Sequence, residues 1–243
     1  MSKRRIWVGI LAFSFPFLFQ FLSPVIPVEG LLDGGILVGA IFVFAFQFFL
    51  SIFFGRIFCG WVCPGGAYQE AFCTHMNNKK PNPKVDKVKF VSWIIWLVAL
   101  VILVILVGGI KEANFFYNTY YIRSVEIWGY YFIIYSIVSL VIFVSASLIG
   151  KRGFCHCFCW MAPFMILGSK IGRKLRIPQL GLKSDTTRCT SCKQCDKSCA
   201  MGLDVADMVK SGAIKNSECI LCGECIEACP QKAIAYTIKR ETK

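Results

Sequence analysis

The sequence predicts an all-α membrane domain of four transmembrane helices, built as two repeated helix pairs and followed by a small α+β domain. Three observations favour this fold class. Of the 243 residues, 56% are hydrophobic and only 17% are charged, whereas soluble proteins usually contain about 25% charged residues. Long apolar runs are confined to the first part of the chain, and a cysteine pair recurs after two of them. Eight of the 14 cysteines then gather in the last part of the chain.

Each of the four apolar runs is close to the roughly 20 residues that a helix needs to cross a bilayer. The predicted spans are Ile6–Val28, Gly34–Phe54, Phe90–Ile110 and Ile127–Ile149. The first contains Pro16, Pro24 and Pro27, which predicts a kinked helix of a kind that membranes tolerate. A signal peptide is the alternative for this run. We favour a retained helix, because no small-residue cleavage site follows and the apolar stretch exceeds a typical signal sequence.

The net charge of +13 is distributed unevenly around these runs. Basic residues gather before the first run, between the second and third, and after the fourth: Lys3, Arg4, Arg5, Arg56, Lys79, Lys80, Lys84, Lys87, Lys89, Lys151, Arg152, Lys170, Arg173, Lys174 and Arg176. The other two loops hold only Lys111 and Arg123. Because loops rich in Lys and Arg stay in the cytoplasm, we expect a multi-pass protein of the cytoplasmic (inner) membrane, surrounded by lipid, with both termini inside. The charge requires no nucleic-acid partner.

The chain becomes polar after Pro178, which predicts a separate domain at residues 183–243. A basic interfacial linker is expected at 169–182, after a membrane domain at 1–168. The C-terminal domain contains the spacing C-x2-C-x2-C-x3-C twice. The first motif consists of Cys189, Cys192, Cys195 and Cys199, and the second of Cys219, Cys222, Cys225 and Cys229. Pro230 follows the second motif, whereas Ala200 follows the first.

This spacing is typical of bacterial two-cluster ferredoxins, in which three cysteines of one motif bind one [4Fe–4S] cluster and the fourth binds the other. We therefore assign one cluster to Cys189, Cys192, Cys195 and Cys229. The second cluster is assigned to Cys219, Cys222, Cys225 and Cys199. Zinc sites are the alternative, but zinc motifs usually separate two cysteine pairs by a longer loop.

The cysteine pair of the membrane domain occurs in "GRIFCGWVCPGG" at 55–66 and again in "GKRGFCHCFCW" at 150–160. Arg56, Phe58, Cys59 and Cys63 recur at one constant offset as Arg152, Phe154, Cys155 and Cys159. On a helix, the two cysteines of each pair would share one face. Both pairs follow a span at its predicted cytoplasmic end. The four thiols would therefore converge if the two halves pack about a pseudo-two-fold axis.

Three interpretations of the repeated pairs are open: buried apolar residues, thiol–disulfide couples favoured by basic neighbours, and a metal centre with two ligands from each half. We favour the third, because electrons would have to pass at this depth between the membrane and the C-terminal domain. The expected third centre is an iron–sulfur cluster held by Cys59, Cys63, Cys155 and Cys159.

Two histidines are weaker candidates for metal binding or proton transfer, because His75 lies near Cys73 and His156 lies between Cys155 and Cys157. A solvated loop position is the alternative for both. Cys73 and Cys157 are left without an assigned role. Residues 164–176 change from apolar to basic, which predicts a short helix on the anionic inner leaflet, with a simple linker as the alternative.

Four predicted helices, two C-x3-C motifs and a two-cluster tail resemble the NapH-like family of membrane iron–sulfur proteins. That family includes the quinol dehydrogenase component of periplasmic nitrate reduction and membrane parts of nitrous-oxide reductase maturation proteins. "CGWVCP" at 59–64 matches the family motif, whereas Trp160 replaces the usual proline in the second copy. The resemblance implies electron exchange with the quinone pool, but the second motif suggests a different branch, so the nitrate-reductase role is not transferred.

The expected function is electron transfer between the quinone pool and a redox protein, within a larger membrane complex. Two [4Fe–4S] clusters and a third centre would carry the electrons. No nucleotide, flavin or substrate motif is present, so a subunit of a quinone-linked oxidoreductase is expected rather than a stand-alone enzyme. The alternative from another class is a redox sensor or metal-maturation factor that uses the C-x3-C thiols directly.

Overall fold

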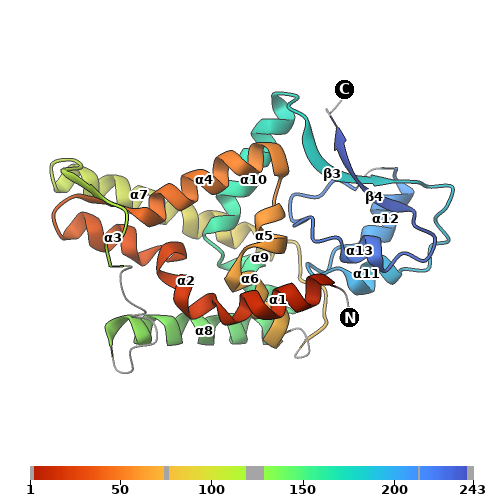
Figure 1. Ribbon diagram of the computed structural model, residues 1–243, viewed down its shortest axis with the longest axis horizontal. Coiled ribbons are helices and arrows are strands. Elements are labelled where there is room, and N and C mark those ends of the chain that lie inside the picture. The colour runs from red at the N-terminus through yellow and green to blue at the C-terminus, as the bar shows by residue number, and fades with distance from the viewer. Residues whose placement is uncertain (1–2, 74–76, 119–128, 213, 240–243) are drawn as a thin grey trace.

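The computed structural model describes residues 3–73, 77–118, 129–212 and 214–239. Helices form the first domain, which is predicted to lie in the membrane and is called the membrane domain below, and a small domain with two strands lies at one end of it (Figure 1). In this view α4, α7 and α10 lie on one side and α1 and α8 on the other, with the short helices α5 and α9 between them. The repeated cysteine motifs are therefore placed inside the molecule.

The first half of the membrane domain begins with short helices separated by breaks. Its elements are α1 (Lys3–Phe13), α2 (Phe15–Leu22), α3 (Val25–Leu32), β1 (Ile36–Val38), α4 (Gly39–Phe54), α5 (Ile57–Trp61) and α6 (Pro64–Cys73). The second half contains η1 (Val85–Lys87), α7 (Val88–Leu106), β2 (Glu112–Asn114), α8 (Tyr130–Ile149), α9 (Gly153–Cys157) and α10 (Met161–Lys174). The order α4–α5–α6 thus recurs as α8–α9–α10.

Within the described part of the chain, two helices are long and apolar enough to cross a membrane, Val85–Leu106 and Tyr130–Ile149. A third span is possible only if α1 and α2, which meet at a bend of 73°, count as one. The second predicted span corresponds to α4, an apolar helix of 16 residues that falls short of the usual length. The described residues are thus consistent with a membrane protein, but the arrangement of four spans is not confirmed. The predicted kink in the first run is a full break into three helices, because Ser14 and Pro24 interrupt it.

The two halves interlock, because the last helix of each packs on the long helix of the other. Helix α10 lies along α4, and α6 lies against α8. Glycines make the first of these contacts close: a Cβ at Gly168 would lie 2.5 Å from the carbonyl oxygen of Phe48, and one at Gly172 would lie 2.3 Å from that of Ile52. Larger residues at these positions would push the helices apart. At the far end, β1 and β2 pair in parallel, with Ile36 opposite Glu112.

The C-terminal domain is built on an antiparallel pair, β3 (Gln179–Ser184) and β4 (Ile234–Lys239), in which Gln179 is opposite Lys239. Three short helices come between the two strands along the chain: α11 (Gln194–Ser198), α12 (Val205–Lys210) and α13 (Glu224–Glu227). The element boundaries differ from the expected linker at 169–182. Helix α10 continues to Lys174 and is packed on α4, and β3 already begins at Gln179.

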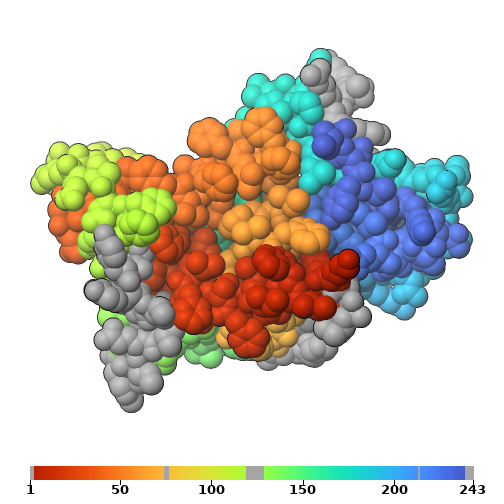
Figure 2. Space-filling view, viewed as in Figure 1, coloured from red at the N-terminus to blue at the C-terminus, as the bar shows by residue number. Residues whose placement is uncertain are grey.

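The C-terminal domain is seated directly on the membrane domain. Figure 2 shows it, in blue, against the N-terminal helix in red and the segment of α5 and α6 in orange. The Nε2 amide of Gln179, at the start of β3, donates to the carbonyl of Ile52 on α4 at 2.6 Å and to that of Ser169 on α10 at 3.0 Å. The segment after α10 is therefore fixed by hydrogen bonds to both halves of the membrane domain.

Candidate metal centres

The two cysteine motifs have the same local structure. Helices α4 and α8 both end at a glycine with positive φ, Gly55 at 57° and Gly150 at 110°. The five-residue helices α5 and α9 follow, and the second cysteine of each motif lies just after its helix. The amides of Val62 and Cys63 both donate to Phe58, and those of Phe158 and Cys159 both donate to Phe154, at 2.8 to 3.0 Å. This tight end turns each second cysteine back toward the first.

Each half supplies a side chain that contacts the first cysteine of the other half. The Nε2 amide of Gln69 donates to the Cys155 Sγ at 3.1 Å, and the Cys59 Sγ donates to the Met165 Sδ at 3.3 Å. Gln69 and Met165 are separated by the same interval as Cys59 and Cys155, so the two contacts are equivalent under the repeat. The sequence analysis missed both residues, because their role depends on how the halves are packed.

The structure brings the four motif thiols together. All four are buried, and every pair among them is close enough that one thiol raises the pKa of the other by electrostatic repulsion. Burial is the larger cause and, with the neighbouring thiols, raises the pKa of Cys63 to about 12. The same causes raise the pKa of Cys155 and of Cys159. Without a cation these three thiols stay protonated at neutral pH, so a bound metal would have to supply the positive charge that ionises them.

Two buried arginines test whether these residues fit an iron–sulfur cluster. Arg56 and Arg152 occupy equivalent positions of the repeat, are 2% and 5% exposed, and interact with the motif thiols. Neither Nε has a hydrogen-bond partner among the described residues. A buried donor without a partner costs about 1–3 kcal/mol, and the sulfurs of an anionic cluster would accept such hydrogen bonds. The donor set and its charge therefore fit the group.

The eight cysteines of the C-terminal domain are sorted into two cavities. One is lined by Cys189, Cys192, Cys195 and Cys229. The other is lined by Cys199, Cys219, Cys222 and Cys225. Each cavity thus brings together the four cysteines of one set assigned from the spacing, and their binding of a cluster stays a prediction.

The loops of these cavities have an unusual backbone conformation at equivalent positions. In both motifs the residues on either side of the second cysteine have positive φ: Ser191 at 57° and Lys193 at 57°, and Leu221 at 52° and Gly223 at 81°. Left-handed residues within a short loop turn successive amides toward one centre, which suits an anionic group. Two amides already reach sulfur, Ala233 to the Cys229 Sγ at 3.3 Å and Leu203 to the Cys199 Sγ at 3.4 Å.

The motif of Cys59 and Cys63 is in direct contact with the loop of Cys222, which lines the second cavity of the C-terminal domain. A Cβ at Gly60 would lie 2.4 Å from the carbonyl oxygen of Ile220 and 3.3 Å from the backbone nitrogen of Cys222. The indole nitrogen of Trp61 donates to the carbonyl of Leu221 at 3.1 Å. Only glycine at position 60 allows the two backbones to approach so closely. The motif thiols and the cavity of Cys222 are therefore neighbouring sites.

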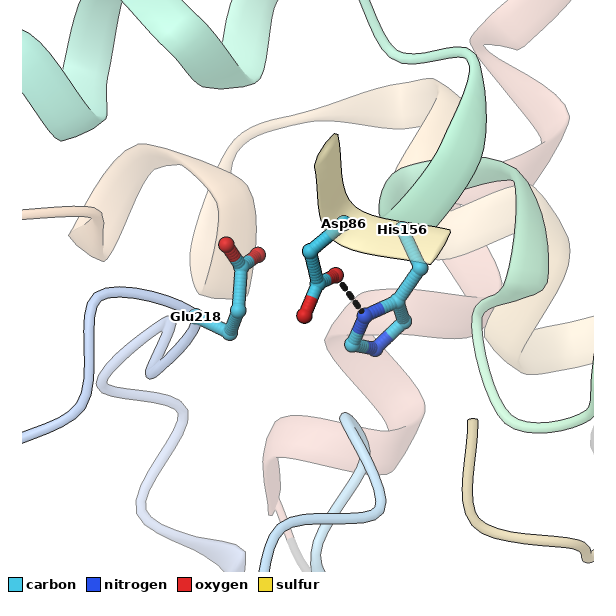
Figure 3. A group of neighbouring side chains, drawn as sticks. All are labelled: Asp86, His156 and Glu218. Atoms are coloured by element: carbon cyan, nitrogen blue, oxygen red, sulfur yellow. Dashed lines mark hydrogen bonds and ion pairs between the residues drawn. The ribbon is translucent and has the colours of Figure 1, made fainter. Parts of the chain in front are cut away.

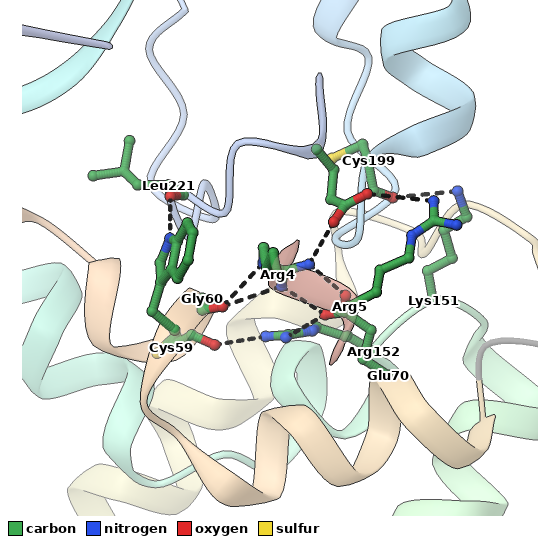
Figure 4. A network of polar contacts seen from close by, with 11 residues as sticks. Arg4, Arg5, Cys59, Gly60, Glu70, Lys151, Arg152, Cys199 and Leu221 are labelled. Atoms are coloured by element: carbon green, nitrogen blue, oxygen red, sulfur yellow. Dashed lines mark hydrogen bonds and ion pairs between the residues drawn. The ribbon is translucent and has the colours of Figure 1, made fainter. Parts of the chain in front are cut away.

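Buried ion pairs at the same interface were not predicted. Figure 4 shows Arg4 and Arg152 converging on Glu70 and on the carbonyls of Cys59 and Gly60. Arg4 bonds Glu70 at 2.6 Å and Glu224 of the C-terminal domain at 2.8 Å, and Arg152 bonds Glu70 at 2.5 Å. Burial alone would raise the pKa of Glu70, but Arg152 and Arg4 lower it to about 2. Several of the basic residues that were assigned to membrane topology are thus structural ion-pair partners.

A second buried group lies around His156. Asp86, His156 and Glu218 have ligand atoms within 4.8 Å of one another, and Figure 3 shows Asp86 between the other two. The His156 Nδ1 is 2.5 Å from Asp86, and its Nε2 is 3.1 Å from the carbonyl of Met201. Both partners offer oxygens that can accept a hydrogen bond from the ring. Lys89 bonds Glu218 at 2.5 Å, so an amine already supplies the cation of this group.

The remaining residues singled out in the sequence are His75, Cys157 and Cys73, and the Cys157 thiol is close enough to interact with that of Cys155. His75 is outside the described residues. The Cys157 thiol donates to the carbonyl of Gly153 at 3.1 Å on its own helix, and burial raises its pKa to about 12. Cys73 is buried at the end of α6, and burial raises its pKa to about 11. Neither Cys73 nor Cys157 interacts with all four motif cysteines.

Comparison with known families supports iron–sulfur binding in both parts of the chain. A family model described as a 4Fe-4S binding domain matches residues 36–83 and again residues 132–178. The two matches begin at the interval that separates Cys59 from Cys155. A model described as a 4Fe-4S dicluster domain matches residues 188–234, which include all eight cysteines of the C-terminal domain.

An uncharacterised protein of Methanocaldococcus jannaschii is 26% identical over 117 residues, which is 48% of this chain and 42% of that protein. The chain thus spans less than half the length of this relative. No solved structure matches the present chain. The two family models support an iron–sulfur electron-transfer protein with ferredoxin-type 4Fe-4S domains.

Proposed function

We propose that this iron–sulfur protein is a membrane-embedded subunit that passes electrons between the quinone pool and a redox partner protein. Two [4Fe–4S] clusters would be held by the crossed cysteine sets of the C-terminal domain. A third iron–sulfur centre would be held by Cys59, Cys63, Cys155 and Cys159. When bound, these groups supply one-electron carriers, and the protein supplies their spacing and electrostatic surroundings.

The observation that carries this proposal is the convergence of four buried thiols, two from each repeat, against the loop of Cys222. Packing residues would not need two equivalent arginines whose Nε donors lack partners. Thiol–disulfide chemistry requires an accessible thiolate, whereas the motif thiols are buried and the pKa of Cys63 is about 12. A metal centre is the function that accounts for both features.

The three sites would form a line. Cys192, in the outermost cavity, is exposed, which suits contact with a soluble partner. The cavity of Cys222 comes next and adjoins Gly60. The motif thiols follow, at the ends of the helices that enter the membrane domain. Electrons entering beside Cys192 would reach the cavity of Cys222 first and the motif thiols from there.

The contacts of the helix ends support the proposed topology. The starts of α1 and α7 and the segments after α4 and α8 all contact the C-terminal domain, through Arg4, Lys89, Arg56 and Lys151 respectively. These ends therefore share one side, which the distribution of charge assigns to the cytoplasm. The arrangement is similar to that expected of a NapH-like quinol-linked subunit, within a larger complex of the inner membrane.

Iron and acid-labile sulfide, measured per chain after anaerobic purification, test the proposal. Three cubane clusters give about twelve irons, and two give about eight. We expect about twelve, with about four lost from a variant in which Cys63 and Cys159 are both serine. A value of about eight in the native protein would show that the motif thiols hold no cluster, and would favour the thiol-based sensor or maturation factor.

A further inference from the structure

A cavity of about 320 Å³ lies between the membrane domain and the C-terminal domain. Its walls come from the segment after α4, from α10, from β3 and from the loop that leads to Cys219. Cys219 is one of the cysteines assigned to the second cluster, and it lines this cavity as well as adjoining its own. The volume falls within the range of small-molecule sites. A ligand here would lie beside a redox centre.

The chemistry of the walls is selective. Arg173, Lys183 and Lys215 line the cavity together with Arg56, which is paired with Glu218. None of the described lining residues is Asp, Glu or His. Ser184 also lines the cavity. Its Oγ is buried and has no hydrogen-bond partner among the described residues. The cavity therefore offers donors and positive charge, which suit a ligand with acceptor oxygens that becomes negative when it is reduced.

Apolar residues complete the site. Ile166, Leu182 and Ile214 contribute apolar walls, which suit a flat ring. At the membrane side, Phe54 directly precedes the lining residue Gly55 and is 44% exposed, and Leu175, two residues after Arg173, is 64% exposed. These side chains would extend an apolar surface from the cavity into lipid. A ligand with a polar ring and a hydrocarbon tail fits this combination better than a small soluble anion.

We propose that this cavity binds the ring of a quinone, an inference that rests on the proposed electron-transfer function and locates its membrane-side substrate. The ring carbonyl oxygens accept hydrogen bonds from Ser184 and from the basic side chains, and the tail leaves past Phe54. Reduction of the quinone to the quinol consumes two electrons and two protons. The electrons, supplied by a reduced carrier protein docked at the other end, arrive singly beside Cys219, and the protons come from water at the solvent-facing rim.

Gly181 allows a direct test. It lines the cavity, and a Cβ at this position would meet no atom within 4 Å, so Gly181→Leu fills the cavity without displacing backbone. Gly9 is equally open but lies on α1, away from the cavity, and Gly9→Leu is the matched control. Ser184→Ala removes the unpartnered hydroxyl with little change in volume, and it serves as the second variant if Gly181→Leu lowers the iron content.

The probe is decylubiquinone, added anaerobically to the purified holoprotein in nanodiscs. Its dissociation constant is measured by calorimetry, and reoxidation of the dithionite-reduced protein is followed by absorbance. We expect Gly181→Leu to weaken binding by more than about tenfold through steric exclusion. Ser184→Ala should weaken it about fivefold, the effect of one hydrogen bond, and Gly9→Leu should match the native protein. Iron content and cluster spectra should be the same in all four proteins.

Three results would overturn the inference, and they are distinguishable. If both cavity variants bind decylubiquinone like the native protein, the quinone site lies elsewhere and the proposed function stands. If the native protein, fully reduced, neither binds nor reduces decylubiquinone, the quinone part of the proposed function fails as well. If Gly181→Leu instead loses a co-purified anionic phospholipid, detected by mass spectrometry, with quinone binding unchanged, the cavity is a lipid site.

Discussion

The two halves of the membrane domain hold their cysteines in the same way but contact the C-terminal domain in different ways. The residue after the first cysteine is Gly60 in the first half and His156 in the second. Gly60 lets the backbone approach Ile220 and Cys222, whereas His156 reaches across to the carbonyl of Met201 and to Asp86. The ligand frame is thus repeated, and the docking contacts are specific to each half. The two halves can therefore repeat the same cysteine spacing and still contact the C-terminal domain through different residues.

We expect the largest effect from removing one motif thiol from either half, because the two halves hold their cysteines in the same way. Cys59→Ser and Cys155→Ser should each abolish the third centre, because neither pair alone supplies four ligands, and the two clusters of the C-terminal domain should remain reducible by dithionite. The double variant should be no worse than either single one, since residues that act as a unit are not additive. Iron analysis and electron paramagnetic resonance measure the loss. Two partial defects that sum would indicate separate dithiol sites.

The equivalent arginines of the two halves have different partners: Arg56 pairs with Glu218 of the C-terminal domain, and Arg152 pairs with Glu70 of the membrane domain. Arg152→Met removes the bonds to Glu70 and to the carbonyl of Cys59, and breaking a buried pair typically costs about 3–5 kcal/mol. Because Arg4 still contacts Glu70, we expect the lower end, about 3 kcal/mol, as a lower midpoint of denaturant unfolding. Glu70→Gln in the same background should recover part of the loss. An unchanged midpoint in Arg152→Met would show that the pair contributes no stability.

Replacement of Gly60 tests the close approach that only the first half makes. A Cβ would lie 2.4 Å from the carbonyl oxygen of Ile220, and overpacking of this kind costs about 1–3 kcal/mol. Gly60→Ala should therefore loosen the C-terminal domain, slow electron transfer between it and the motif thiols, and increase cleavage of residues 175–178 by protease. Gly9→Ala, at a position with nothing within 4 Å, is the control. Native protease resistance in Gly60→Ala would exclude this role.

Acid should weaken the same interface through Glu70. Its folded-state pKa of about 2 lies below the ordinary glutamate value of about 4.3. The stabilisation is therefore complete above that ordinary value and is lost as the pH falls toward 2. Thermal midpoints measured between pH 6 and pH 3 should decline, and Glu70→Gln should remove part of that decline. An equal decline in both proteins would assign the acid sensitivity to other groups, including the clusters.

The smallest expected effect comes from exchanging the equivalent residues Gln69 and Met165. Hydrogen bonds to cluster sulfurs help to set the reduction potential, and a donor favours the more negative, reduced state. Gln69→Met should therefore lower the midpoint potential of the third centre, and Met165→Gln should raise it, each by the equivalent of about 1 kcal/mol. Redox titration measures both shifts. Shifts of the same sign would contradict the equivalence of the two contacts.

Local spacing predicted the cysteine motifs and the repeat, because both depend on residues close together in sequence. The family matches confirm iron–sulfur binding domains over both. The membrane spans were less predictable, because hydropathy counts apolar residues and does not register a change of direction. The first run has the composition of one span, yet its helices α1 and α2 meet at 73°.

The ion pairs were missed for a different reason. Arg4 pairs with Glu224, and Arg56 with Glu218, and no local pattern links residues so far apart. The useful signal was the presence of acidic residues beside the cysteine motifs, Glu218 before Cys219 and Glu224 before Cys225. Basic residues near a membrane are expected from topology alone, which concealed their second role.

The Arg4–Glu224 pair also has a consequence for biogenesis. It joins the first described helix to a residue near the end of the chain, and each motif takes contacts from the other half. During synthesis, α1 would leave the ribosome long before any of its partners in the C-terminal domain exist. Arg4 can therefore pair first with Glu70 of α6, and its contact with Glu224 can form only after residue 224 has been synthesised. A chain truncated before residue 224 should therefore keep the Arg4–Glu70 pair and lose this tie between α1 and the C-terminal domain.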